Sequence, residues 1–374
     1  KGTGGIHAEK GGEMVARIAE RLGLSAGQSE LAQWLVAHHL MLSETAFKRD
    51  LDDAQTLTDF VAHVQSPERL RLLLLLTVSD IKAVSPALWN RWKGALIRDL
   101  YHRAMAHMGV GRALISSPPQ IAETLLREIP DAERDAAHHM LQQSLPSGFW
   151  QRPREEQVTT LRSYAAWQRA AHRPIVMLEH DRFRAVSEVT CCVTGEASSF
   201  RSLVGVMGWL GASIVSARSM TLTDGAIIAH FAIQDASGNS FAEESFRLTP
   251  MTELVNKALN GELDFTRELA KRSVISMGRD VAIAPSVFID NQVSATASVI
   301  EVNARDRLGL LYDILGAMAE CQLQVATAHI ATYGSRAVDV FYVKDVYGLK
   351  LEHHTKRAQV HHALLHACHR ENAA

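Results

Sequence analysis

The sequence has little of what marks secreted or membrane-bound proteins. Only 4 of its 374 residues are cysteines, and they form no CxxC pair and no disulfide framework, which fits a reducing cytosol. The longest apolar run, Leu72–Val78, is far shorter than the ~20 residues that a membrane-spanning helix needs. Nothing resembling a signal peptide opens the chain. We therefore expect a cytoplasmic protein with no membrane partner.

The chain also lacks an excess of basic residues. Its 39 lysines and arginines are balanced by 41 aspartates and glutamates, for a net charge of −2, so we expect no nucleic-acid partner. Hydrophobic residues make up 47% and charged residues 21%, as in ordinary globular proteins, which excludes wholesale disorder. The length predicts two or three domains. Because the first residue is Lys1 rather than Met, we expect a fragment of a longer soluble protein.

The chain from Lys1 to Ala171 is predicted to be helical, because its apolar residues recur with the period of an α-helix. The expected helices are Ser25–Leu42, Pro67–Lys82, Ala87–His107, Gln120–Ile129, Asp131–Leu145 and Glu155–Ala171. The leucine-rich helix Pro67–Lys82 is apolar on every side, which predicts a central, buried position. The breakers at 116–119 and 146–148 indicate that the last three helices form a connector.

After Pro174 the period changes to 2, which indicates strands. A strand, a helix, two strands joined by a hairpin turn and a second helix are predicted in that order: Val186–Thr194, Phe200–Leu210, Ser213–Leu222, Ala226–Gln234 and Met251–Leu259. This β-α-β-β-α order is that of a ferredoxin-like unit.

The same unit occurs a second time further along the chain. When the chain is aligned with itself, Ile214 falls on Val325, and after the hairpin, where the offset shrinks by one, Phe231 falls on Phe341. The second copy ends after a helix from about His354 to Cys368, so it has no fourth strand at its end. The β-branched segment Val287–Asn291, just upstream, is our candidate for that strand.

Four residues of the helical part form a candidate metal site. His7, His38, His39 and Asp80 lie where the predicted helices converge, and imidazole with carboxylate suits divalent transition metals. Two observations favour ordinary structural roles instead. The 18 histidines include four adjacent pairs, so one pair says little, and Asp80 has Lys82 and Arg71 as possible partners. Spacing alone leaves both interpretations open.

Residues 1 to about 108 resemble the HD-type metal-dependent phosphohydrolase domain of the bifunctional uridylyltransferase/uridylyl-removing enzymes, which modify nitrogen regulatory protein PII. The resemblance lies in KGTGGIH, WLVAHHLMLSETAFKRDL and LLLLLTVSDIKAVSPALWNRWKGALIRDLY. The two later repeats resemble ACT domains, with the signature EVNARDRLGLLYDILGAM from Glu301.

The resemblance implies an all-α HD-type domain followed by two tandem α+β ferredoxin-like ACT domains. Their expected bounds are 1–110 for the HD-type domain, 111–174 for the connector, and 175–272 and 285–374 for the ACT domains. We expect the first histidine and the His-Asp pair that name the HD family to lie before the first residue, with the nucleotidyltransferase domain. A homo-oligomer through the ACT domains is also expected.

The resemblance implies that His7, His38, His39 and Asp80 hold a divalent metal (Mn, Mg or Fe) and that Lys1 is catalytic. The implied reaction is hydrolysis of the phosphodiester that links UMP to a tyrosine of PII. A metal-bound water attacks in line, and Lys1 neutralises charge that builds on the phosphoryl group.

The ACT resemblance implies an effector site for L-glutamine in the second repeat. Its loop is Asp306, Arg307, Leu308, Gly309 and Leu310, where helix N-terminal amides meet a carboxylate and Asp306 meets an amino group. In the first repeat this position reads 194–198, Thr-Gly-Glu-Ala-Ser, which departs from the pattern. Without the resemblance, Asp306 and Gly309 are a helix cap and a turn.

Three hypotheses of function follow. The first is the uridylyl-removing and glutamine-sensing part of the PII-modifying enzyme. The second is a catalytically inactive fragment that binds amino acids and oligomerises. The third is a guanosine tetraphosphate hydrolase, which also joins HD and ACT domains, although no synthetase-like stretch separates them here.

Overall fold

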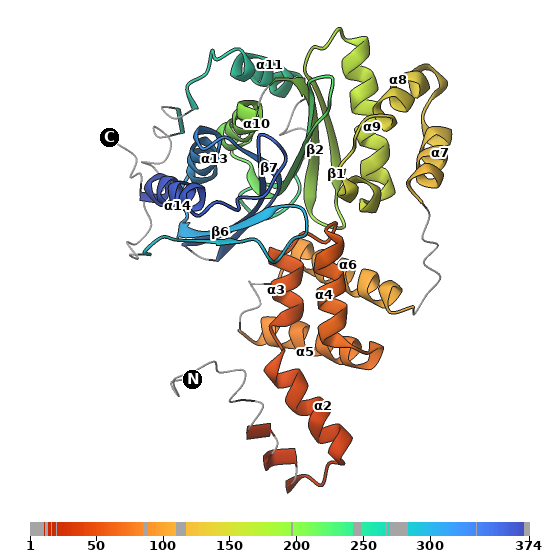
Figure 1. Cartoon of the computed structure of the whole chain (residues 1–374), viewed down its shortest axis with the longest axis vertical. Helices are drawn as coiled ribbons and strands as arrows, with labels where there is room; N and C mark the ends of the chain where they lie inside the picture. The colour runs from red at the N-terminus through yellow and green to blue at the C-terminus, as the bar shows by residue number, and fades with distance from the viewer. Residues whose placement is uncertain are drawn as a thin grey trace. The chain divides into compact units, whose positions relative to one another are not determined.

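The computed structural model describes residues 11, 14–15, 17–19, 21–84, 89–109, 117–195, 197–241, 248–265, 268–269, 283–333 and 335–369. The chain divides into two compact units, Lys1–Ile115 and Ser116–Ala374. The first is helical and the second combines helices with one sheet (Figure 1). Each unit is described by itself.

The first unit is a helical bundle around a leucine-rich core. Its helices are α2 (Ala26–Ala37), α3 (Met41–Lys48), α4 (Ala54–Val64), α5 (Pro67–Val84) and α6 (Arg91–His107). Ser25, Asp53 and Asn90 each accept a hydrogen bond from a first-turn amide, and so begin α2, α4 and α6. The core consists of buried apolar side chains, chiefly Leu42, Phe60, Leu70, Leu73, Ile97 and Leu100.

The predicted single helix Ser25–Leu42 is wrong in one respect, because it is two helices with a break at the histidine pair. Helix α2 ends at Ala37, and α3 begins at Met41. The His38 ring bonds the carbonyl of Trp34, and the His39 ring bonds that of Val36, both at 2.8 Å. Side chains that occupy the carbonyls of the last turn compete with continuation of the helix.

The prediction of a central, buried position for the leucine-rich helix is correct for the position and wrong for the burial. Helix α5 packs against α2, α3, α4 and α6, but it is not buried on every side. Helix α5 buries one face, with Leu70, Leu73 and Thr77, whereas Leu75 is 65% exposed and Val84 67% exposed. The sequence misled because the leucine run continues through both faces, while tertiary packing covers only one of them.

The second unit contains an eight-stranded antiparallel sheet in the order β1-β2-β4-β3-β7-β8-β6-β5. Its strands are β1 (Ile175–Asp181), β2 (Val186–Thr194), β3 (Ser213–Thr221), β4 (Ala226–Gln234), β5 (Ser286–Asp290), β6 (Ser298–Arg305), β7 (Leu323–Tyr333) and β8 (Arg336–Asp345). The first four belong to the first repeat and the last four to the second, so the ferredoxin-like duplication is confirmed. The strands predicted for 186–194 and 226–234 are confirmed at both ends.

In both repeats the edge strand comes before the β-α-β-β-α unit rather than after it. The expectation that Val287–Asn291 supplies this strand is confirmed, because β5 pairs with β6. Strand β1 does the same beside β2, although the sequence analysis named no such strand. The signal was present, since the alignment that places Ile214 on Val325 also places Ile175 on Ser286, the first residues of the two edge strands.

The two repeats join edge to edge through equivalent residues. Ala217 of β3 pairs with Ala328 of β7, and these two occupy the same position in their repeats. The strand β3 has an irregularity between Ile214 and Ser216, and β7 has one at the equivalent place, between Val325 and Thr327. The seam therefore lies on a local two-fold axis, and the duplication preserved even the bulge.

Helices cover the sheet in two separate groups (Figure 1). On one face lie α10 (Ala197–Trp209), α11 (Leu248–Leu259), α13 (Leu310–Glu320) and α14 (His354–His369), which share one large core with strands of both repeats. Helix α9 (Arg154–Arg169) packs against β1, β2 and β4. Helices α7 (Pro118–Glu128), α8 (Asp131–Leu141) and η2 (Ser147–Gln151) join it in a second core that includes residues of these strands. The helices predicted as a connector therefore pack on the outer face of the first repeat.

No helix in the described ranges is both long and apolar enough to cross a membrane.

Candidate functional site

The histidine pair lies at the break between α2 and α3. In both rings Nδ1 is 2.8 Å from a backbone carbonyl, so Nδ1 donates and Nε2 carries the ring's lone pair. This tautomer is usual in metal-binding histidines, whose other nitrogen is held by a carbonyl or carboxylate. The His38 ring also stacks on Trp34, with 4.7 Å between centroids. The donor chemistry fits a metal ligand.

Asp80 lies on α5, which packs against α2. One turn before it, the Thr77 hydroxyl donates to the carbonyl of His39 at 3.3 Å. Residues three apart share a face of a helix, so Asp80 lies on the side of α5 that meets the histidine pair. Within the described ranges no three His, Cys, Asp or Glu side chains gather closely enough to hold a metal. Lys1 and His7 lie outside the described residues.

The effector loop of the second repeat connects β6 to α13. The amide of Asp306 donates to Ser335 at 2.9 Å, which anchors the end of the strand. Gly309 precedes α13 with φ +85°, a left-handed conformation that favours glycine, and the Asp313 amide donates to its carbonyl. This geometry fits the expected role of Gly309 in bringing the backbone close to a ligand, which stays a prediction.

The remaining loop residues hold the loop in place. Arg307 donates to the carboxylate of Asp313 at 2.6 Å and to the carbonyl of Ala367 at 3.1 Å, so it ties α13 to α14. Leu310 is 3% exposed and belongs to the core, against which Leu308 also packs. Asp306 thus offers the exposed polar side chain of this loop.

Two cavities border helix α13. One of about 240 Å³ opens between α13 and α14, and it borders Asp313 and Ala367, the two partners of Arg307. The other, of about 30 Å³, lies across the seam at the start of α10 and has room for one water. The start of α13 in the second repeat is equivalent to the start of α10 in the first. There the side chain of Leu269 packs close to the loop, 3.5 Å from where a Cβ of Gly309 would be.

A buried carboxylate that the sequence analysis missed lies behind the effector loop. Asp339 of β8 is 2% exposed, and its Oδ1 accepts no hydrogen bond from any described residue. Burial, with the nearby charge of Asp306, raises the pKa of Asp339 to about 8. Asp306 is exposed as a residue, but partial burial of its carboxyl raises the pKa of Asp306 as well, against a hydrogen bond from Thr332. The alignment that places Phe231 on Phe341 places Ala229 on Asp339, and this contrast between the repeats was the available signal.

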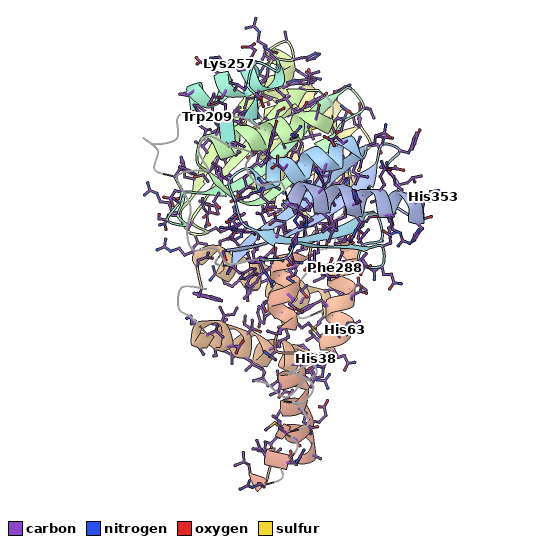
Figure 2. The ribbon with its side chains drawn as sticks, turned by 90° about the vertical axis from the view of Figure 1, so that its left-hand side faces the viewer. His38, His63, Trp209, Lys257, Phe288 and His353 are labelled. Carbon is purple, nitrogen blue, oxygen red and sulfur yellow. The ribbon has the colours of Figure 1, made fainter. Side chains whose placement is uncertain are left out.

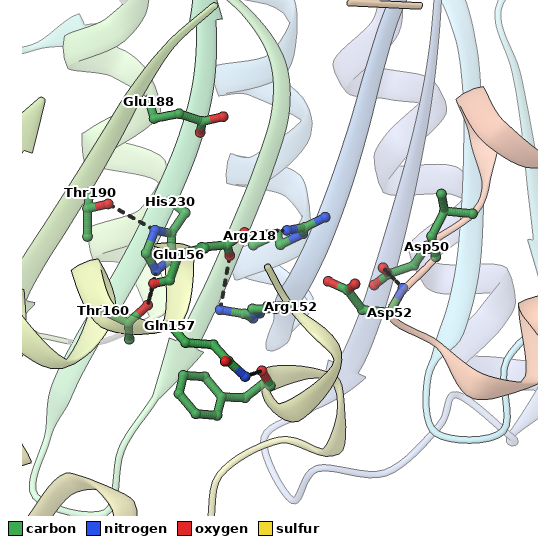
Figure 3. Close-up of polar contacts among 12 residues, drawn as sticks. Asp50, Asp52, Arg152, Glu156, Gln157, Thr160, Glu188, Thr190, Arg218 and His230 are labelled. Atoms are coloured by element: carbon green, nitrogen blue, oxygen red, sulfur yellow. Dashed lines mark hydrogen bonds and ion pairs between the residues drawn. The ribbon is translucent and has the colours of Figure 1, made fainter. Parts of the chain in front are cut away.

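A second buried polar cluster binds α9 to the outer face of the first repeat. His230 lies between the hydroxyls of Thr160 and Thr190, at 2.9 Å from each (Figure 3). Burial lowers the pKa of His230 to about 4. Beside it, Glu156 pairs with Arg218 at 2.9 Å. Burial alone would raise the pKa of Glu156, but Arg218, His230 and Arg152 lower it to about 2. The cluster is structural.

The fold and the loop define a class of domain. Residues 286–370 match the family described as "ACR9-like, ACT-like domain". This match covers the second repeat, and the first repeat has the same strand order and the same seam residues. The second repeat is therefore an ACT-like domain, and the first repeat lies beside it in the same sheet with the same order of strands.

Comparison with curated proteins gives relatives that match along nearly the whole chain. A protein of Azospirillum brasilense named bifunctional uridylyltransferase/uridylyl-removing enzyme is 42% identical over 373 residues, which is 98% of this chain and 40% of the relative. Proteins of the same name from Gluconobacter oxydans and Rhodospirillum rubrum are 39% and 37% identical, over 98% and 97% of this chain. The chain spans about 40% of the length of these relatives.

Proposed function

We propose that this chain carries the uridylyl-removing and glutamine-sensing part of a cytoplasmic enzyme that attaches UMP to nitrogen regulatory protein PII and removes it. One observation carries the proposal: enzymes named for both activities match 98% of the chain, through the helical unit and both repeats. The reaction assigned to the helical unit is hydrolysis of the phosphodiester between UMP and a tyrosine of PII.

The proposed division has an HD-type domain at 1–110, a connector at 111–174, and ACT domains at 175–272 and 285–374. Assembly of a homo-oligomer through the ACT-like repeats is part of the proposal. Light scattering of the purified protein tests it, and a monomer at micromolar concentration would contradict it.

The residues that would hold a divalent ion (Mn, Mg or Fe) are His7, His38, His39 and Asp80. When bound, such an ion lowers the pKa of a coordinated water and neutralises phosphoryl oxygens. The tautomer of His38 and His39, fixed by their Nδ1 bonds to Trp34 and Val36, presents Nε2 for coordination. Lys1 would stabilise the negative charge that develops on the phosphoryl group.

Substitution of the histidine pair in the full-length protein tests the hydrolase proposal. His38→Ala and His39→Ala should each lower bound metal and lower hydrolysis of UMP-modified PII by about 100-fold or more, as losses of groups that only support a ligand already reach about 10- to 100-fold. The matched control is His63→Ala. His63 on α4 makes the same Nδ1 bond to a carbonyl of its own helix, but is exposed (Figure 2).

Elemental analysis and a phosphodiesterase assay, run in parallel, separate the three hypotheses. Metal content that is unchanged in both His38→Ala and His39→Ala would contradict the metal site. A wild-type protein that hydrolyses guanosine tetraphosphate but not UMP-modified PII would contradict the substrate. A protein that does neither, yet binds amino acids, would indicate a regulatory fragment.

L-glutamine is the proposed effector, bound at Asp306, Arg307, Leu308, Gly309 and Leu310. Titration calorimetry with glutamine compares the wild type with Asp306→Ala, which removes the exposed carboxylate and should weaken binding about 10-fold or more. Glu352→Ala, which removes another exposed carboxylate of the same repeat, is the control. Equal affinity of the wild type and Asp306→Ala would remove the loop from the assignment.

A further inference from the structure

The carboxylate of Asp339 lies in surroundings that do not satisfy it. It points from β8 to the helix-covered face of the sheet, as do its neighbours Ala337 and Phe341 in the common core. A buried carboxylate needs a positive partner or hydrogen bonds, because its desolvation is costly. The backbone of Ala331 supplies one hydrogen bond to the carboxylate. Yet the residue is 2% exposed, and its Oδ1 accepts no hydrogen bond from any described group.

The charged groups near Asp339 do not supply a counter-charge. Asp306 adds a second negative charge, which favours the protonated form of Asp339. Arg307 is the positive group nearby, but it donates to Asp313 and to the carbonyl of Ala367. Cys368 of α14 is protonated, because burial raises its pKa to about 11. None of these described groups therefore gives an ionised Asp339 a positive partner.

The equivalent site of the first repeat has no such deficit. Ala229 occupies the position of Asp339, between Cys191 and Ser219, as Asp339 lies between Val302 and Ile330. When the pairing of β2 with β4 is superposed on that of β6 with β8, Gly195 lies where the second repeat has Asp306. The predicted match of 194–198 with 306–310 is therefore wrong by one residue. Neither acidic residue has a counterpart, so the deficit belongs to the second repeat alone.

We propose that Asp339 is the buried partner of the α-ammonium group of an amino-acid effector held under the 306–310 loop of the second repeat. The inference rests on the proposed sensing function and goes beyond it by naming the ligand's charged group and the residue that recognises it. In the first repeat, Ala229 leaves an amino acid without this partner. The cavity of about 240 Å³ between α13 and α14 is lined by Asp313 and Ala367, the two partners of Arg307.

The ligand-free carboxyl is protonated at neutral pH, because its pKa is raised to about 8. An ammonium ion favours the ionised form and lowers that pKa. Binding at pH 7 should therefore release about one proton to the buffer. Asp306 is the charged group that acts on Asp339, and it favours the protonated form before binding. Cys368 also lies near Asp339 and is itself influenced by Arg307 and Asp313.

The test compares two ligands and three proteins by calorimetry. The ligands are L-glutamine and glutaramic acid, which is the same molecule without the α-amino group. The proteins are the wild type, Asp339→Asn and the control Glu352→Gln, an exposed carboxylate of the same repeat. Asp339→Asn replaces a buried carboxyl, protonated in the ligand-free protein, by a neutral amide of nearly the same shape. It should fold about as stably as the wild type, which circular dichroism checks.

We expect the wild type and Glu352→Gln to bind glutamine about 10- to 100-fold more tightly than glutaramic acid, the value of one charge-assisted hydrogen bond. Asp339→Asn should bind glutamine as weakly as glutaramic acid, and both more weakly than the wild type binds glutamine. Glutamine binding to this variant should release no proton. Undiminished glutamine binding by Asp339→Asn would overturn the inference and leave glutamine sensing intact. If Asp339→Asn loses affinity for glutamine and for glutaramic acid by the same factor, the inference is overturned too, since that result indicates a structural role for Asp339.

Two further outcomes separate the inference from the proposed function. If the wild type binds a different α-amino acid in an Asp339-dependent way, the choice of glutamine is wrong and the inference stands. If the wild type binds no amino acid at all, both are wrong.

Discussion

The two repeats of the second unit have the same backbone plan but bury different polar groups. The difference lies at two adjacent positions of the equivalent strands β4 and β8. Strand β4 has Ala229 and His230 there, and β8 has Asp339 and Val340. In the first repeat the polar residue faces outward, where Thr160 and Thr190 bond it. In the second it faces inward, beneath α13 and α14, and lacks a partner for one oxygen among the described residues.

This difference separates what a duplication keeps from what it changes. The pairing register, the bulge and the seam residues persist because a slip by a single position would turn every side chain to the opposite face. A single polar substitution changes no hydrogen bond of the sheet. In the first repeat the polar position faces α9, which packs on β1, β2 and β4. In the second repeat the polar position faces the interior, and the proposed ligand site depends on it.

Placing the second repeat's carboxylate in the first should have the largest effect. Ala229→Asp buries a carboxylate at a site that is 0% exposed and belongs to the apolar core. We expect a loss of about 3–5 kcal/mol in the free energy of unfolding, measured with urea. Ala229→Asn, which adds similar bulk without charge, is the control. Equal losses in both variants would show that size and not charge is responsible.

Two equivalent helix glycines should respond differently to alanine. A Cβ at Gly205 would lie 2.5 Å from the buried ring of Phe265, whereas one at Gly316 would lie 2.8 Å from the guanidinium end of Arg201. Gly205→Ala should cost about 1–3 kcal/mol through overpacking. Gly316→Ala should be nearly neutral, because Arg201 can move and alanine favours helix. Thermal unfolding measures both, and a larger loss for Gly316→Ala would contradict the packing described.

The pH dependence of stability should differ in sign between the two buried groups. Asp339 keeps its proton in the folded state up to about pH 8 but loses it near 3.8 when unfolded, so its contribution to stability falls as pH rises between these values. His230 stays neutral down to about pH 4, so its contribution is lost as pH falls from about 6.5 to 4.

Unfolding of the wild type and Asp339→Asn between about pH 4 and 8 isolates the first of these contributions. The stability advantage of the variant should grow by at most about 1.4 kcal/mol per pH unit, the value for one proton. Glu188→Gln serves as a comparison, because burial raises the pKa of Glu188 to about 7 and gives the same sign over a narrower range. A difference between wild type and Asp339→Asn that does not change with pH would show that Asp339 is not buried as described.

Much of the fold was predictable because the patterns that specify it are local. Alternation of apolar residues predicted β2 and β4 to the residue, and the internal repeat located the edge strand β5. The end of α2 was not predictable in this way. It depends on two imidazoles bonding carbonyls of their own helix, and the same rings suit a continuing helix equally well in sequence.

The candidate sites were predictable only in part. The resemblance singled out the 306–310 loop and the histidine pair, but Asp339 is a single acid in a β-rich run, and nothing local distinguishes it from a surface residue. Its importance follows from the helices that bury it and from Asp306, which follows a different strand in the chain but lies beside it in space.

The order of the elements, the duplication and the register of each strand were determined by the sequence itself, since hydrophobic period and turn residues act over a few positions. Which faces of α5 are covered, which repeat α9 packs against and which carboxyl is left in a dry interior were decided by tertiary structure alone. Burial and electrostatic coupling depend on distances in space, and these join residues whose separation along the chain carries no signal.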